Sequence, residues 1–183
     1  VADKMKLHNA NASTFSDWWA YKYEVIDAIP YNAAIMTKVG VNTSINSDDA
    51  EMARRLNQEA AKAVKYGGVT EEEALKMVTL NPAKMLHVDD KVGSLKAGKS
   101  ADLVIWTDHP LSIYAKPVKT FVDGIDYFDA ERDLKLREEI RKERERLIQK
   151  SLDQKKIGMP TQKPAKAERK LYHCDDAENE MSY

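Results

Sequence analysis

The sequence has little that would cross-link it covalently or hold it in a membrane. Its single cysteine, Cys174, excludes an internal disulfide framework and leaves the redox compartment undecided. No apolar run reaches the roughly 18 residues that a spanning helix needs, so we expect no membrane span. The 29 basic and 30 acidic residues nearly cancel, for a net charge of −1. This balance gives no overall attraction to nucleic acid, and we expect no nucleic-acid partner.

What the sequence does contain is an alternation of helical and strand-like patterns in its first third. A hydrophobic content of 43% permits a core, and 183 residues correspond to about one domain. The alternation is typical of a parallel sheet and predicts an α/β fold. The expected elements are a helix ending near Asn9, a strand at 12–15, an aromatic loop at 16–21, helices at 24–29 and 31–38, a strand at 41–46 and one helix at 51–68.

The strand at 41–46 delivers carboxylates to its carboxyl end, where a helix begins. Asn46, Ser47, Asp48 and Asp49 follow its apolar residues directly. In α/β proteins that end of a strand is where chemistry is placed. Asp48 also has the spacing to Glu51 of a helix N-cap, so capping is an alternative interpretation. One aspartate can cap while the other faces a site, and both interpretations stay open.

Downstream, the pattern changes from short helices to strands. Thr70 and Glu73 have the spacing of a capping box, and Asn81 is expected to cap a short helix with Pro82 at its first position. The strands that follow belong to a small sheet separate from the βα region. We expect them at 101–106, 118–122 and 125–128, the last two joined by a two-residue Asp123-Gly124 turn.

Residues 80–111, LNPAKMLHVDDKVGSLKAGKSADLVIWTDHPL, resemble the C-terminal signature of the amidohydrolase superfamily, metal-dependent hydrolases that include imidazolonepropionase and dihydroorotase. SINSDD at 44–49 is similar to the end of that family's eighth barrel strand. The resemblance covers roughly residues 1–129. It implies the C-terminal part of a TIM-type (β/α)8 barrel, strands of a small composite β-sandwich, and a charged helical tail. The implied regions are 1–81 for the last βα units, 82–129 for the exit segment and sandwich strands, 130–156 for the charged helix and 157–183 for a flexible tail.

By this resemblance, the intact protein hydrolyses C–N bonds in non-peptide or dipeptide-like small amides. Asp48 matches the family's strand-eight aspartate, which binds the catalytic metal and acts as general base toward water. Asp49 is then a cap or a supporting residue. The loop after the strand at 12–15 would overhang the substrate, with simple packing as the alternative. The implied substrate-binding residues are Trp18, Trp19, Tyr21 and Asn46, and Ser16 or Asp17 is expected to add a polar contact.

The sequence departs from the family in its histidines. The family's metal site needs an H-x-H pair and further histidines, whereas His8, His87, His109 and His173 form no such pair. A lone carboxylate does not hold zinc, which takes about four ligands. We therefore expect a divalent metal, zinc above all, in the intact enzyme, and neither metal nor activity in this chain alone. Val1 falls in what reads as mid-helix, which suggests a missing beginning.

Two strands of an eight-stranded barrel would leave edges unpaired. The expected partner is therefore the N-terminal portion of the same protein, beside a small amide substrate, and homo-oligomers are an open alternative. The compartment, exported or cytoplasmic in a bacterium, is undecided.

The tail suggests a different function. Residues 130–156 read as one charged helix with Glu138/Lys142 and Arg141/Glu145 pairs at i,i+4. Its thin apolar stripe suits a solvated helix or a dimerisation seam. A non-catalytic binding or scaffold module that uses this helix is the alternative to the hydrolase. His173 and Cys174 at the polar terminus are weak candidates for metal ligands.

Overall fold

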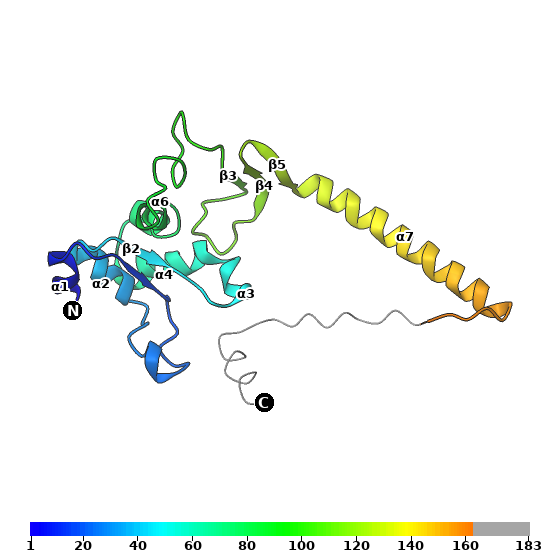
Figure 1. Ribbon diagram of the computed structural model, residues 1–183, viewed down its shortest axis with the longest axis horizontal. Coiled ribbons are helices and arrows are strands. Elements are labelled where there is room, and N and C mark those ends of the chain that lie inside the picture. The colour runs from blue at the N-terminus through cyan, green and yellow to red at the C-terminus, as the bar shows by residue number, and fades with distance from the viewer. Residues whose placement is uncertain (163–183) are drawn as a thin grey trace. The chain divides into compact units, whose positions relative to one another are not determined.

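The computed structural model describes residues 1–162, and the chain divides into two units, Val1–Asp126 and one that begins at Tyr127. Each unit is described by itself, and Figure 1 labels most of their elements. The first contains α1 (Ala2–Leu7), β1 (Ala12–Thr14), the 3-10 turn η1 (Tyr23–Val25), α2 (Asn32–Val39), β2 (Thr43–Ile45), α3 (Ala50–Ala53), α4 (Leu56–Gly67), α5 (Glu71–Lys76), α6 (Leu80–Met85), β3 (Leu103–Trp106) and β4 (Pro117–Val122), and the division falls within β5 (Ile125–Asp129).

Strands β1 and β2 pair in parallel, with α2 between them in the chain. The register places Ala12 opposite Thr43 and Thr14 opposite Ile45. The ladder continues past β2, where the Asn46 N–H donates to the Thr14 carbonyl at 3.1 Å. Because parallel strands end on the same side, the segments that follow β1 and β2 emerge together. The predicted α/β character is confirmed, with strands shorter than expected.

Small side chains let α2 and α4 pack closely behind these strands. Ala33 and Ala34 of α2 meet Ala60 and Ala63 of α4 in one buried cluster. A Cβ added to Gly67, at the end of α4, would lie 2.0 Å from the Cβ of Ala34. The glycine therefore has a packing role in addition to marking the end of the helix.

The second edge of β2 makes two hydrogen bonds within this chain, and the expectation of unpaired barrel edges stays a prediction. The Ile45 N–H donates to the carbonyl of Met77, a fully buried residue, at 3.1 Å. The Asn81 side-chain amide donates to the Thr43 carbonyl at 2.8 Å. Asn81 is thus not an N-cap as predicted, because α6 begins one residue earlier and the amide satisfies a strand carbonyl instead.

The signature residues after α6 fix the path of the backbone. Gly93 has φ +82, and a Cβ there would lie 2.7 Å from the Cβ of Ala83 and 3.1 Å from the Cα of Leu80. Only glycine has both the positive φ and the room for this close contact at low energetic cost. The N-P-A and V-G-S-L parts of the signature therefore contact each other directly.

Lys99, from the G-K-x-A-D part of the signature, closes the loop that follows. Its ammonium donates to the carbonyl of Val92 at 3.1 Å, to Ser94 Oγ at 2.7 Å and to the carbonyl of Asp89. A half-buried cation with three acceptors fixes a turn-rich segment that has few other constraints.

Strands β3, β4 and β5 form the separate sheet expected from the sequence, in the order β3-β4-β5 with β3 and β4 antiparallel. Asp123 and Gly124 have φ of +51 and +77, as a two-residue hairpin turn between right-twisted strands requires. The predicted hairpin is confirmed. The Asp102 carboxylate additionally accepts from the Asp123 N–H at 2.8 Å and holds the turn against the end of β3.

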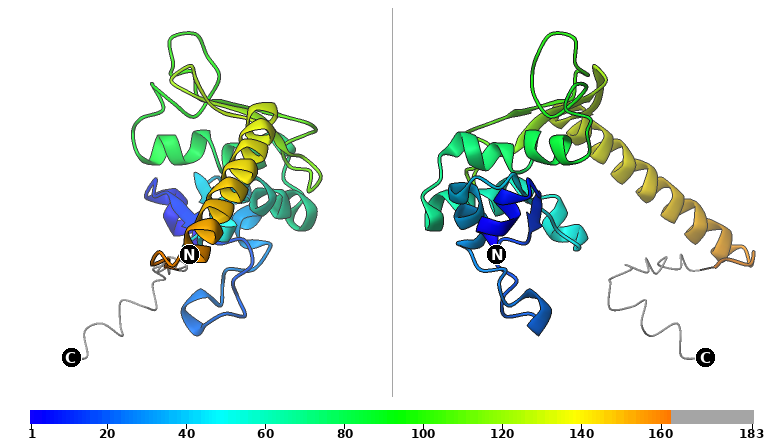
Figure 2. Two further views of the ribbon diagram at one scale, coloured as in Figure 1. Left: turned by 90° about the vertical axis from the view of Figure 1, so that its right-hand side faces the viewer. Right: turned by 60° about the vertical axis from the view of Figure 1, so that its left-hand side comes forward.

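Two helix predictions are wrong. The helix expected at 24–29 is only the 3-10 turn η1, followed by a turn at Ile26 and Asp27. Its N-cap residue, Lys22, provides no side-chain cap, and the proline at position 30 disfavours helix in the residue before it. The segment between β1 and α2 projects from its surroundings in the views of Figures 1 and 2. The second error is the single helix at 51–68, which breaks at Arg54 and Arg55 into α3 and α4.

In the second unit, α7 (Ala130–Lys156) covers the same residues as the predicted charged helix. Ion pairs join Arg141 to Glu145 at 2.6 Å and Lys142 to Glu138 at 3.5 Å, as the spacing predicted. Asp129 caps the helix by accepting from the N–H groups of residues 131 and 132. No helix within residues 1–162 has the length and apolar character that crossing a membrane requires.

Candidate active site

The turn after β2 carries Asp48 and Asp49, and the two have different roles. Asp49 is the N-cap of α3, its Oδ1 accepting from the N–H groups of Glu51 and Met52 at 2.9 Å each. The interpretation of Asp48 as the cap is therefore wrong, and that of Asp49 as a cap is confirmed. Asp48 is exposed and lies between the carboxyl end of β2 and the start of α3.

Asn46 connects the ends of the two parallel strands. The hydroxyl of Ser13 on β1 donates to Asn46 Oδ1 at 2.9 Å. This bond fixes the side-chain oxygen of Asn46 and leaves its amide nitrogen as the group that can meet a substrate. The role of Asn46 in substrate binding stays a prediction.

The aromatic loop after β1 brings two of its three predicted residues together. Trp18 stacks on Phe15 with ring centroids 4.4 Å apart and meets the edge of Tyr21 at 5.6 Å. The indole N–H of Trp18 donates to Met52 Sδ at 3.1 Å, which links the loop to α3. Trp19 and Tyr21 are 53% and 58% exposed. Trp18 is thus half-buried and bound to α3, whereas Trp19 and Tyr21 are mostly exposed to solvent.

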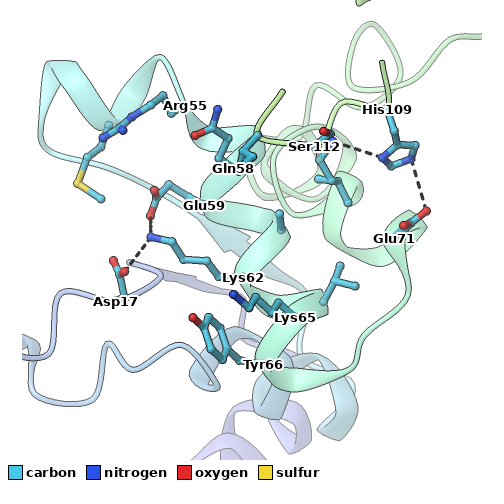
Figure 3. A pocket seen from close by; sticks show the side chains of 15 residues that line it. Asp17, Arg55, Gln58, Glu59, Lys62, Lys65, Tyr66, Glu71, His109 and Ser112 are labelled. Atoms are coloured by element: carbon cyan, nitrogen blue, oxygen red, sulfur yellow. Dashed lines mark hydrogen bonds and ion pairs between the residues drawn. The ribbon is translucent and has the colours of Figure 1, made fainter. Parts of the chain in front are cut away.

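A charged network fixes the start of this loop to α4 (Figure 3). The Lys62 ammonium donates to Asp17 Oδ2 and Glu59 Oε2 at 2.8 Å each and to Ser16 Oγ at 3.3 Å. The Ser16 hydroxyl donates in turn to Glu59, and both residues are 5% exposed. Burial lowers the pKa of Lys62, but the hydrogen bonds to Asp17 and Glu59 outweigh it and raise the pKa above its usual range.

This network corrects the expectation for Ser16 and Asp17, which were predicted to offer a polar contact to substrate. Their side chains bind residues of α4 instead. Sequence reasoning missed Glu59 and Lys62 altogether. The available signal was the position of Glu59 beside Ala60 on the buried side of α4, with a lysine three residues later to balance its charge.

A cleft of about 790 Å³ borders the network. It is lined mainly by α4 and by the segment that begins at His109, whose Nε2 lies 3.5 Å from the Glu71 carboxylate. Asp17 and Met52 also line it, but Trp18, Trp19, Tyr21, Asn46 and Asp48 do not. Asp17 is therefore the one residue predicted to contact substrate that lines the cleft, and His109 was not among the predicted site residues.

The described residues do not form a metal site by themselves. Within residues 1–162, no three or more His, Cys, Asp or Glu side chains gather in an arrangement that could hold a metal ion. One carboxylate from Asp48 falls short of the four donors that a tetrahedral zinc site needs. His173 and Cys174, the weak candidates from the sequence, lie outside the described residues.

Known proteins resemble this chain in both sequence and structure. Residues 29–127, just over half of the chain, match the family described as the amidohydrolase family. The amidohydrolase tasK of Hapsidospora irregularis is 34% identical over 116 residues, which are 63% of this chain and 12% of that protein. An imidazolonepropionase of Picrophilus torridus is 30% identical over 112 residues, 57% of this chain and 28% of that enzyme.

A solved structure agrees with these relatives. The crystal structure of an amidohydrolase from Thermotoga maritima superimposes with a TM-score of 0.61 at 29% identity, covering 70% of this chain and 34% of that one. The chain thus spans about an eighth to a third of the proteins that it matches. Together with the paired strands and the signature that packs behind them, the family match shows that this chain belongs to the amidohydrolase family.

Proposed function

We propose that this chain is part of a longer hydrolase that cleaves C–N bonds in amides, cyclic amides or dipeptide-like small molecules. Membership of the amidohydrolase family supports this, as do relatives named amidohydrolase and imidazolonepropionase. Those relatives are several times longer than the matched region. The remaining parts of the site, and the protein's expected partner, would then be the N-terminal portion of the same polypeptide.

In this proposal, β1 and β2 are the seventh and eighth strands of a (β/α)8 barrel, within a barrel region at 1–81. Residues 82–129 are the exit segment and the strands that complete a small sandwich, and 130–156 form the charged tail helix. The parallel pairing of β1 and β2 across α2 supports the assignment, because two consecutive barrel strands are joined in this way.

Asp48 is the proposed general base. The observation that carries this role is its position directly beyond the carboxyl end of β2, with the helix cap supplied by Asp49 instead. A carboxylate oxygen of Asp48 takes the proton of the attacking water and returns it to the leaving nitrogen. Asp48 would also supply one oxygen ligand to a divalent metal, and the other ligands would have to come from the rest of the longer protein.

The aromatic loop provides the proposed wall of the substrate site. Trp19 and Tyr21 are more than half exposed, and Trp18 contacts the ring of Tyr21 and binds Met52 of α3. Aromatic side chains with a few polar groups are typical of sites for small molecules. The amide nitrogen of Asn46 is the proposed polar contact beside Asp48.

The test is an Asp48→Asn substitution in the longer protein, with Asp49→Asn as its matched control. A positioned general base contributes about 10²–10⁴ to the rate, so we expect kcat to fall by that factor for Asp48→Asn. Asn caps a helix about as well as Asp, so Asp49→Asn should retain most of the activity. Full activity of the Asp48→Asn protein, or equal losses in both variants, would reject the role proposed for Asp48.

A further inference from the structure

Lys62 binds three side chains, those of Ser16, Asp17 and Glu59, and the proposed reaction does not use it. It pairs with Glu59 on its own helix and with Asp17 on the loop after β1, both at 2.8 Å. Glu59 is buried, so its charge requires this partner. The Asp17 contact is different, because it joins two segments 45 residues apart.

The contact between Lys62 and Asp17 lies at the start of the aromatic loop at 16–21. Asp17 directly precedes Trp18, whose indole N–H reaches Met52 in α3. The segment between β1 and α2 otherwise projects from its surroundings (Figures 1 and 2) and contains exposed residues such as Tyr23 and Ile26. Few buried contacts therefore hold this segment, and its anchored start determines where the aromatic residues stand.

We propose that Lys62 is a positioning residue: through Asp17 and Ser16 it holds the aromatic loop so that Trp18 packs on α3, beside the turn that carries Asp48. This inference rests on the proposed function, in which the loop forms the substrate wall. Lys62 acts from behind the loop, and the aromatic side chains meet the substrate.

The first test follows the tryptophans by fluorine NMR in the longer protein labelled with 5-fluorotryptophan, in which Trp→Phe variants assign the resonances of Trp18, Trp19 and Trp106. Asp17→Asn removes the charged contact between the loop and Lys62 and leaves the Lys62–Glu59 pair in place, so the buried Glu59 keeps its partner. We expect the Trp18 resonance to shift and broaden, the Trp106 resonance to stay, and Asp17→Glu to restore the original spectrum. Glu72→Gln, which breaks the exposed Glu72–Lys76 pair of α5, is the matched control.

The second test is kinetic and uses the longer protein. If Asp17→Asn leaves the loop ordered a third to a tenth of the time, KM should rise roughly threefold to tenfold, because apparent affinity falls with the competent fraction. The value of kcat should change much less, and Glu72→Gln should change neither. A merely structural contact would lower the melting temperature without separating KM from kcat.

The two tests separate this inference from the proposed function. An unchanged Trp18 resonance in Asp17→Asn overturns the inference whatever the enzyme does. A shifted resonance with unchanged KM also overturns it, because the loop then does not contact substrate. If the wild-type longer protein hydrolyses no amide, the proposed function fails, and the fluorine spectra alone decide whether Lys62 and Asp17 anchor the loop.

Discussion

The signature segment at 80–111 fixes the path of the backbone, whereas the turns beyond β1 and β2 also carry the exposed residues proposed for chemistry. In the signature, Lys99 and Asp102 are bound to backbone groups, and Gly93 has a conformation and a close contact that require glycine. At the strand ends, Asp48, Trp19 and Tyr21 are exposed. The residues by which the family is recognised therefore fix the backbone. The residues proposed for chemistry are weak markers of the family.

This comparison predicts that substitutions in the signature cost stability, whereas Asp48→Asn costs activity. The largest effect on stability is expected for Gly93→Ala. A residue with a side chain at φ +82 costs about 1–2 kcal/mol, and the overlap with Ala83 and Leu80 adds about 1–3 kcal/mol. Urea unfolding followed by circular dichroism measures the loss.

Gly98→Ala is the control for this prediction. Gly98 has φ +91, and nothing lies within 4 Å of the Cβ it would gain. Only the backbone cost of about 1–2 kcal/mol should then appear. Equal losses at both glycines would show that the packing of Gly93 on α6 contributes nothing.

Lys99→Met is expected to have the next largest effect. The substitution keeps the aliphatic length and removes the donor to the carbonyls of Asp89 and Val92, for a loss of about 1.5–3 kcal/mol. Lys96→Met, at an exposed position of the same loop, should stay within about 0.5 kcal/mol of the wild type. If both variants unfold at the same urea concentration, the network of Lys99 is not what holds the loop.

A smaller effect, in the opposite region, concerns the pH dependence of the Lys62 network. The pKa of Lys62 is raised in the folded chain because its hydrogen bonds to Asp17 and Glu59 outweigh burial. The folded state therefore holds this proton more tightly than the unfolded state does, and the stabilisation is complete below about pH 10. It is lost as the pH rises through the folded pKa.

The measurement is urea unfolding of wild type and Asp17→Asn at pH 7 and above pH 11. At pH 7 the difference should be about 0.5–1 kcal/mol, in keeping with a partly exposed pair, and it should shrink at the higher pH. A difference that grows with pH would contradict the assigned sign.

The smallest effect is expected from deleting α7, which belongs to neither region. In the longer protein, truncation after Asp129 should leave kcat/KM unchanged, because the ion pairs that support α7, such as that of Arg141 with Glu145, lie within the helix itself. Lost association with a partner, together with no dependence of any activity on Asp48, would favour the binding-module alternative instead.

Features decided within a few residues were predictable from the sequence. The capping box joins Thr70 to Glu73 as expected, with the Glu73 N–H donating to Thr70 Oγ1 at 3.1 Å. The Asp123-Gly124 hairpin and the bounds of α7 were also predictable. Each rests on a preference that its own residues express without help from elsewhere in the chain.

Choices between neighbouring candidates could not be made in this way. Asp48 and Asp49 both precede a helix, and the sequence does not say which of them caps it. In the structure Asp49 is the cap, and the helix ends early because the chain breaks at Arg54. Met52 lies in the segment expected to be one helix at 51–68, yet its sulfur accepts from Trp18 of the aromatic loop. The spacing of apolar residues does not reveal the two-residue break between α3 and α4, after which the apolar side of the helix faces another direction.

The sequence by itself determined the α/β alternation, the hairpin and the signature by which the family is recognised. The tertiary structure decided where the polar side chains go: Asn81 to a strand carbonyl 38 residues away, and Lys62 to Asp17 across 45 residues. The reason is physical. Local propensities act within one turn or one strand, whereas a buried polar group takes the partner that folding brings within 3 Å, and only the packed chain specifies that partner.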